Sequence, residues 1–200
     1  MSDNIYNVCY AGLLVSEMGY LLSFVYINAW VSQFFIDQPQ GIMMAKSLSE
    51  QIAALSMFVG IIMGVVIGSR IDGKDKKILP YCIALFFFRG VGLVTMTTIV
   101  TDFSSQKVLL VACFIAMTSG TFCQTIVCQS LLNKRLVAPI KEIMNGAGQA
   151  FRAMGVLMVT GLGGIVSSVD VNAPFLMVGL FDLAIGLSIV ILCSRNQLKE

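Results

Sequence analysis

Six long apolar stretches leave this chain few ways to fold. They occupy residues 10–35, 51–69, 78–100, 108–132, 144–169 and 171–193. A helix needs about 20 mainly apolar residues to cross the roughly 30 Å hydrocarbon core of a bilayer. Stretches this long and this evenly apolar do not suit barrel strands, and a helix pairs its own backbone groups in lipid. The sequence therefore predicts an all-α membrane protein, a single domain over residues 1–200 with six transmembrane helices.

Composition agrees with this class and argues against several functions. Apolar residues make up 57% of the chain and charged residues only 12%, about half of the fraction in a soluble domain. The chain has no histidine, and its six cysteines lie in or at the ends of the stretches without metal-site spacing. We therefore expect no enzymatic activity, no metal and no cofactor. A net charge of +2 gives no support for nucleic-acid binding, so the expected surroundings are a lipid bilayer.

Lysine and arginine fall mainly on one side of the predicted bundle. With six spans, the loops after the second and fourth stretches share a side with both termini. That side carries nine basic residues: Arg70, Lys74, Lys76, Lys77, Lys134, Arg135, Lys141, Arg195 and Lys199. The opposite loops carry two, Lys46 and Lys107. By the positive-inside rule, both termini are predicted to be cytoplasmic, while the choice of membrane stays open.

A charged turn follows the second apolar stretch, where residues 68–77 read GSRIDGKDKK. This segment resembles the G-x-x-x-D-x-x-x-[RK]-[RK] signature of the major facilitator superfamily, which joins the second and third helices of each six-helix half. The matching residues are Gly68, Asp72, Lys76 and Lys77, while Gly73 and Asp75 differ from the usual arginine and glycine. The resemblance implies a cytoplasmic latch that breaks and reforms as two halves of a transporter rock.

The fifth stretch carries a second resemblance. Residues 144–164 read MNGAGQAFRAMGVLMVTGLGG, similar to the glycine-rich fifth or eleventh helix of the same superfamily. The glycines on the spacing of its antiporter-type signature are Gly146, Gly155, Gly163 and Gly164, with Val159-Thr160 in place of its central Gly-Pro. The fourth stretch has Ala116 where an N-terminal half usually has arginine. The chain is thus most similar to the C-terminal half, helices seven to twelve.

This resemblance implies a fold and a function. The fold would be half of the family's bundle, two three-helix inverted repeats. The function would be secondary active transport of a small solute by alternating access, with proton coupling as one option. Alternating access needs two bundles around a site, so a homodimer or a separately encoded N-terminal half would complete it. The alternative is a truncated or degenerate membrane protein that transports nothing and serves as a scaffold or assembly partner. The sequence names no substrate.

Ionisable residues inside the apolar stretches are expensive in lipid and are candidates for function. Arg89 and Asp182 each lie about 11 residues from the cytoplasmic ends of the third and sixth stretches, or about 16 Å deep. Matched depth predicts an ion pair between these two helices, because pairing neutralises both charges.

Glu17 lies on the first stretch, which by the resemblance would line the central cavity, and no basic residue of the other cavity-lining helices matches its depth. An unpaired buried carboxylate can take up a proton near neutral pH, which suits a proton path. A glutamate hydrogen-bonded to a neighbouring helix is an equally good interpretation. Tyr20, Asn28 and Gln124 lie on the first and fourth stretches and could line the same path.

Two glycine faces complete the predictions. Gly60, Gly64 and Gly68 recur every four residues on the second stretch, and Gly155 and Gly163 lie on the fifth. Small residues let neighbouring helices approach closely. We expect both faces to contact the missing half, where rocking bundles would slide past one another.

Overall fold

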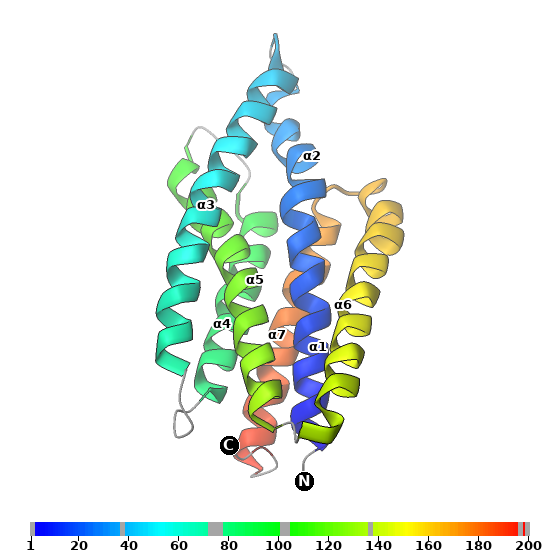
Figure 1. Cartoon of the computed structure of the whole chain (residues 1–200). Helices are drawn as coiled ribbons and strands as arrows, with labels where there is room; N and C mark the ends of the chain where they lie inside the picture. The colour runs from blue at the N-terminus through cyan, green and yellow to red at the C-terminus, as the bar shows by residue number, and fades with distance from the viewer. Residues whose placement is uncertain are drawn as a thin grey trace.

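Helices make up the regular structure in the part of the chain that the computed structural model describes, residues 3–36, 39–71, 78–100, 105–135, 138–195 and 198. Six helical spans are long and apolar enough to cross a membrane (Figure 1). This arrangement indicates an integral, multi-pass membrane protein. Both ends of the chain lie at the same end of the bundle.

The first span is continuous but not uniform. It consists of α1 (Asp3–Leu21), a π-helical turn η1 (Leu22–Tyr26), α2 (Ile27–Ser32) and a 3₁₀ turn η2 (Gln33–Phe35). A π turn accommodates one extra residue in an α-helix and is frequent at functional sites. The whole span, Asn4–Phe35, has 32 residues.

The other five spans are single α-helices. They are α3 (Gly41–Ile71), α4 (Leu79–Thr98), α5 (Lys107–Arg135), α6 (Ala138–Ser167) and α7 (Ala173–Ser194). Pro80 and Pro174 occupy first-turn positions of α4 and α7, where proline removes no helical hydrogen bond. The first residue of α3 is Gly41, and a larger residue would not fit there because its Cβ would collide with the carbonyl oxygen of Phe35.

The helix ends extend the predicted stretches unequally. α4 and α7 match their predicted bounds within two residues, because Pro80 and Pro174 mark their starts. α3 begins ten residues before the predicted residue 51, and α6 begins six residues before the predicted residue 144. Both extra segments contain charged residues, Lys46 and Glu50 in the first and Lys141 and Glu142 in the second, so hydropathy alone does not include them.

Helix contacts define the bundle. α4 packs along α7 and α5, α3 packs along α5, and α1 packs against α5, α6 and α7. At the end opposite the termini, α2 and the start of α3 form a hairpin that projects beyond the other helices (Figure 1). α1 and α5 are the most buried spans, while α3 and α6 flank them and leave most of their surface outside.

The glycine faces contact helices of this chain, so the prediction that they contact a missing half is wrong for four of the five. A Cβ at Gly60 would lie 3.3 Å from Ser119 Cα, and one at Gly64 would lie 3.0 Å from Ile126 Cδ1, both on α5. Gly155 and Gly163 face α1 and η1, as described below. The four glycines let α3 and α6 dock closely on the inner helices of the same bundle. Gly68 has open space around it.

The buried apolar residues form two clusters. One, towards the hairpin, contains Trp30, Phe114 and Phe175; the other, towards the termini, contains Leu13 and Phe86. The Trp30 indole donates a hydrogen bond of 2.8 Å to Asn172 Oδ1, which ties α2 to the start of α7. Along α4, Arg89 lies between Phe86 of one cluster and Leu93 of the other.

Candidate functional site

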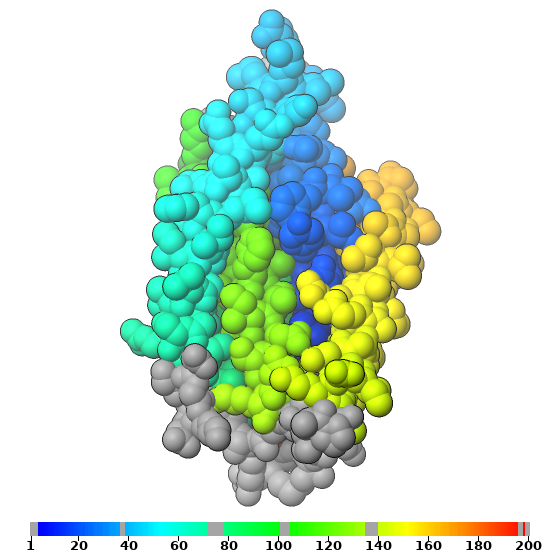
Figure 2. All heavy atoms as spheres, viewed as in Figure 1, coloured from blue at the N-terminus to red at the C-terminus, as the bar shows by residue number. Residues whose placement is uncertain are grey.

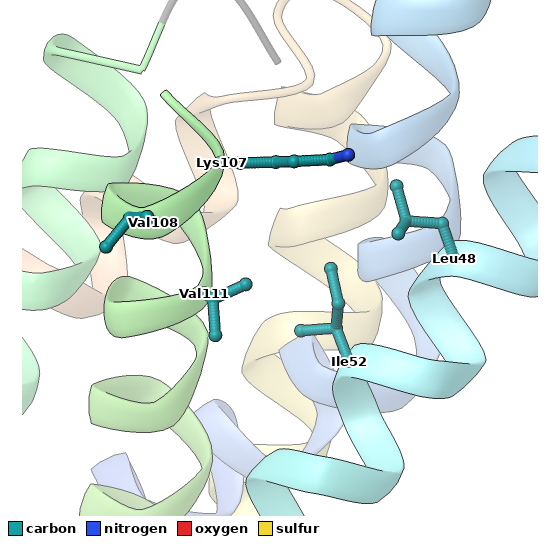
Figure 3. Close-up of a pocket in the computed structure, with 5 residues that line it drawn as sticks. All are labelled: Leu48, Ile52, Lys107, Val108 and Val111. Atoms are coloured by element: carbon teal, nitrogen blue, oxygen red, sulfur yellow. The ribbon is translucent and has the colours of Figure 1, made fainter. Parts of the chain in front are cut away.

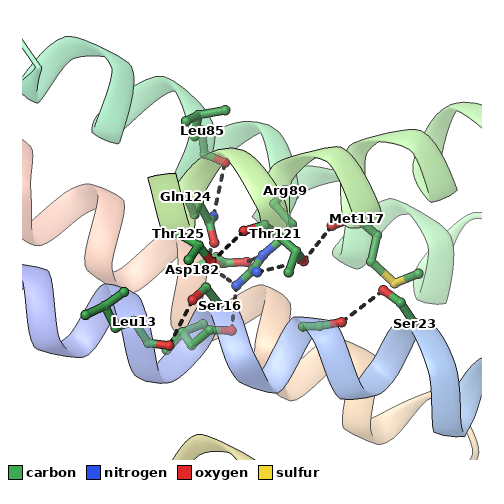
Figure 4. Close-up of polar contacts among 12 residues, drawn as sticks. Leu13, Ser16, Ser23, Leu85, Arg89, Met117, Thr121, Gln124, Thr125 and Asp182 are labelled. Carbon is green, nitrogen blue, oxygen red and sulfur yellow. Dashed lines mark hydrogen bonds and ion pairs between the residues drawn. The ribbon is translucent and has the colours of Figure 1, made fainter. Parts of the chain in front are cut away.

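Arg89 and Asp182 meet in the layer between the two apolar clusters (Figure 4). Arg89 Nε donates to Asp182 Oδ2 at 2.6 Å and Nη2 donates to Oδ1 at 2.8 Å. The contact is therefore bidentate, the strongest geometry for this pair of groups. Both side chains are fully buried. The ion pair predicted from the matched depths of Arg89 and Asp182 on the third and sixth stretches is confirmed.

The same guanidinium also reaches α1 and α5. Nη2 donates to the carbonyl oxygen of Val15 at 2.9 Å, and Nη1 donates to Thr121 Oγ1 at 3.0 Å. Gln124 Nε2 donates to Asp182 Oδ1 and to the Leu85 carbonyl oxygen, each at 3.3 Å. The network joins α1, α4, α5 and α7 around a fully buried centre. It holds four helices together and offers no path to a solute.

This position of Gln124 corrects one prediction. Gln124 was expected to line a solute path on α5, but its side chain is buried and bonded to the Arg89–Asp182 pair. The helical periodicity of α5 turns it away from the side on which Gln129 lies. Its Oε1 has no hydrogen-bond partner among the described residues.

Two glycines make room for Arg89, and sequence reasoning missed both. A Cβ at Gly19 of α1 would lie 2.5 Å from Arg89 Nη1. A Cβ at Gly120 of α5 would lie 2.8 Å from Arg89 Cβ. The available signal was their position along the chain: Gly120 is next to Thr121, and Gly19 lies one helical turn after Val15, the residues that Arg89 contacts on α5 and α1.

Glu17 has a basic partner, so of its two interpretations the unpaired carboxylate is wrong and the glutamate hydrogen-bonded to a neighbouring helix is confirmed. Arg152 of α6 donates from Nε to Glu17 Oε1 at 2.6 Å, and Nη2 completes an ion pair with the same oxygen. The two side chains keep 15% and 32% of their surface exposed, so this pair opens to the outside of the bundle. A Cβ at Gly155 would collide with the Leu14 carbonyl oxygen, and this close approach of α6 to α1 brings the charges into reach.

The two charges lie at the same position along their helices. Glu17 is the fifteenth residue of α1 (Asp3–Leu21), and Arg152 is the fifteenth residue of α6 (Ala138–Ser167). Counted from the predicted starts at residues 10 and 144, Glu17 is the eighth residue and Arg152 the ninth, so the predicted stretches already place the two at similar depth. The two charges are therefore at one depth, about 21 Å along their helices.

A polar stripe runs along α6 beside this pair. Its residues recur at helical spacing and are Glu142, Asn145, Gln149, Arg152 and Thr160. Gln149 and Thr160 are exposed, and Asn145 Oδ1 accepts a hydrogen bond of 3.3 Å from Gln129 on α5. The neighbouring side of α6 is apolar and exposed at Met154 and Leu157, as suits contact with lipid.

We define the open face by five residues of α1, α5 and α6: Glu17, Tyr20, Gln129, Gln149 and Arg152. Figure 2 shows this side of the molecule, with α5 and α1 between the flanking α3 and α6. Tyr20 is 43% exposed there, and its ring contacts that of Phe24 at a centroid distance of 4.6 Å. Asn28, the other predicted path residue on this span, is exposed but accepts a hydrogen bond from Ser49 Oγ of α3.

The charged turn cannot be placed in the same way. Asp72, Lys76 and Lys77 lie outside the described residues, and Gly68 is close to the end of α3. The latch therefore stays a prediction. Of the glycines on α6, Gly163 faces the Tyr26 ring with an ideal Cβ 3.0 Å from its hydroxyl, Gly164 is exposed, and Gly146 has open space.

A separate pocket of about 290 Å³ lies between α3 and α5, towards the end of the bundle opposite the termini (Figure 3). Leu48 and Ile52 of α3 line one wall, and Val108 and Val111 of α5 line the other. The Lys107 side chain extends across its mouth. The pocket is apolar with one cation at the rim, which suits an alkyl chain better than a polar solute.

No family model, no curated protein and no solved structure matches this chain.

Proposed function

We propose that the chain is one six-helix half of a secondary transporter, which moves a small solute across a membrane by alternating access against a second bundle. The observation that carries this proposal is the Glu17–Arg152 pair. An ion pair at mid-membrane depth with both side chains partly exposed is costly against lipid tails. Water, a polar solute or another protein surface would remove that cost.

The helix contacts support the accompanying fold proposal. α1 contacts α6 as α5 contacts α3, and α4 and α7 contact each other. If the first, second and third spans are exchanged with the fourth, fifth and sixth, the α1–α6 contact becomes the α5–α3 contact, and the α4–α7 contact maps onto itself. Such an exchange is expected of two three-helix inverted repeats, which the resemblance to the major facilitator superfamily implies. In such folds the solute site lies near the bilayer midplane, between two bundles.

The polar and aromatic side chains of the open face are suited to line a path. Tyr20, Gln129 and Gln149 add hydrogen-bonding groups and an aromatic surface around the ion pair. A site of this kind combines apolar walls with a few polar groups that orient the solute. If Glu17 exchanges its bond to Arg152 for a proton, the same site couples transport to proton movement.

Water access to the open face tests the proposal. A single cysteine replaces Tyr20 in a chain in which Cys193→Ser removes the partly exposed native thiol; the other five thiols are buried. We expect Tyr20→Cys to react with a membrane-impermeant, water-soluble thiol reagent added from either side of sealed vesicles, because alternating access opens the path to each side in turn.

Leu157→Cys is the matched control. Leu157 is the twentieth residue of α6 and Tyr20 the eighteenth of α1, so their depths are similar, but Leu157 lies on the apolar side. It should stay unreactive. If Tyr20→Cys is as unreactive as Leu157→Cys from both sides, no water path exists and the non-transporting scaffold replaces this proposal.

A further inference from the structure

The charges of the open face are self-complementary. Glu17 and Arg152 are adjacent, lie at equal depth on α1 and α6, and both remain partly exposed after pairing with each other. Each oxygen and each guanidinium N–H that is not used inside the chain can serve a second partner of opposite charge. A surface that covers the open face should therefore present one base and one acid at this same depth.

A second copy of the chain meets that requirement by geometry alone. Two copies enter the membrane in the same orientation, because their loops carry the same charges. The twofold axis that relates them must then be parallel to the membrane normal, and rotation about it leaves depth unchanged. In a contact of this kind, residue i meets the partner's residue j while j meets the partner's i.

We propose that a second copy of this chain covers the open face, and that Glu17 pairs with the partner's Arg152 while Arg152 pairs with the partner's Glu17. The four charges then form a closed ring at mid-membrane depth, shielded from lipid on all sides. This inference rests on the proposed function and names the second bundle. At the ring, the two copies would close the path between them, and opening the path would require the cross-copy pairs to separate while each internal pair persists.

Lipid is a poor alternative cover. Acyl chains offer no hydrogen bonds to a carboxylate or a guanidinium, and the headgroups lie at the bilayer surface rather than at this depth. The polar stripe of α6 makes the same argument along its length, because Gln149 is exposed beside the ring. The lipid-facing side of α6 is the apolar one, with Leu157.

Two neutralised copies provide the test. Glu17→Gln leaves a face with Arg152 alone, and Arg152→Gln leaves a face with Glu17 alone. Like copies then repel, whereas a mixture of the two restores one cross-copy pair. The variants are co-expressed with two different tags, and capture by one tag is followed by quantification of the other in native lipid nanodiscs. We expect the mixed pair to co-purify at least about tenfold better than either variant with itself, within the range of typical coupling between sites.

The control is Lys107→Gln, which lowers the net charge by one, as Arg152→Gln does, but away from the open face. Copies carrying it should associate as the unmodified chain does. Because the mixed pair contains both neutralised chains, its recovery also shows that each one folds. Equal recovery of the mixed and like pairs, or no association of the unmodified chain, overturns the inference.

The outcomes separate this inference from the proposed function. If the copies do not associate but Tyr20→Cys reacts from both sides, the second bundle is a different chain, and the inference fails while the transport proposal stands. If the mixed pair forms preferentially and Tyr20→Cys is unreactive, the charge ring stands and the path fails.

Discussion

The Arg89 guanidinium holds four helices through one side chain. It contacts Asp182 on α7, Thr121 on α5 and a carbonyl oxygen of α1, while its own backbone belongs to α4. Glycines at positions 19 and 120 leave the space that it fills. A buried pair satisfied in this way adds little net stability against an apolar replacement, but breaking it leaves an uncompensated charge.

A double-mutant cycle at this pair should therefore be strongly non-additive. Arg89→Met alone and Asp182→Leu alone should each lower the free energy of unfolding by about 3–5 kcal/mol, and the double variant should lose less than either. Unfolding can be followed by the emission of Trp30, because the chain contains one tryptophan and it is buried. Losses that simply add would mean that the two side chains do not interact.

Gly155 and Gly161 form a matched pair on α6 for a second prediction. Gly155→Ala puts a methyl group against the Leu14 carbonyl oxygen and should lower the free energy of unfolding by about 1–3 kcal/mol. Gly161→Ala meets nothing within 4 Å and should be neutral or stabilising by up to about 1 kcal/mol. Thermal unfolding in detergent compares them; equal effects would exclude a tight α1–α6 contact at Gly155.

For single residues, the sequence predicts the depth of buried charges better than it predicts the small residues that pack around them. The depths of Arg89 and Asp182 follow from counting along two helices whose ends are marked by charged or proline-containing segments. The same count along the first and fifth predicted stretches pairs Glu17 with Arg152, which are the eighth and ninth residues, so this partner was accessible and was missed. Gly19 and Gly120 look like any other small residues until the arginine that lies between them is placed.

Among the elements, the π turn η1 interrupts the regular α-helix of the first span between α1 and α2. Its five residues, Leu22–Tyr26, end where the Tyr26 hydroxyl donates a 2.9 Å hydrogen bond to the Val159 carbonyl oxygen of α6. Val25 lies in the middle of the exposed side of this turn and is 54% exposed. An apolar pattern does not reveal such a turn, because one additional residue shifts the pattern without interrupting it.

The π turn predicts an asymmetry between deletion and insertion. Deleting Val25 should convert the turn into regular α-helix and keep Trp30 in its buried position, since a π turn contains one residue more than an α turn. Inserting an alanine after Val25 should instead rotate Trp30 by about 100° out of the core. Trp30 emission measures both, with a red shift expected only for the insertion. A red shift in the deletion variant alone would contradict this account.

For the molecule as a whole, six spans place the two termini on one side, and Figure 1 shows both there. Arg70, Lys134, Lys141 and Arg195 lie towards this end, whereas Lys46 and Lys107 lie towards the other. We expect tags on both termini to be cleaved by protease added to inside-out vesicles and protected in right-side-out vesicles. Cleavage of both tags in right-side-out vesicles would invert the orientation without changing the fold.

Most of the overall arrangement was accessible from the sequence, because lipid restricts a chain with six such stretches to helices. The contacts between helices were less accessible. Gly60 and Gly64 could serve a neighbour in the same bundle or in another one, and only the packing of α3 against α5 decides between them.

The Arg89–Asp182 pair also has a consequence for synthesis of the chain. The two residues are separated by 93 positions, so at about 5–20 residues per second the ribosome needs about 5 to 20 seconds to make the aspartate after the arginine. During that interval, α4 carries an arginine whose counter-ion has not yet been synthesised. A chain released before α7 would retain that unpaired arginine, an exposed mark by which membrane quality control could recognise and remove an unfinished product.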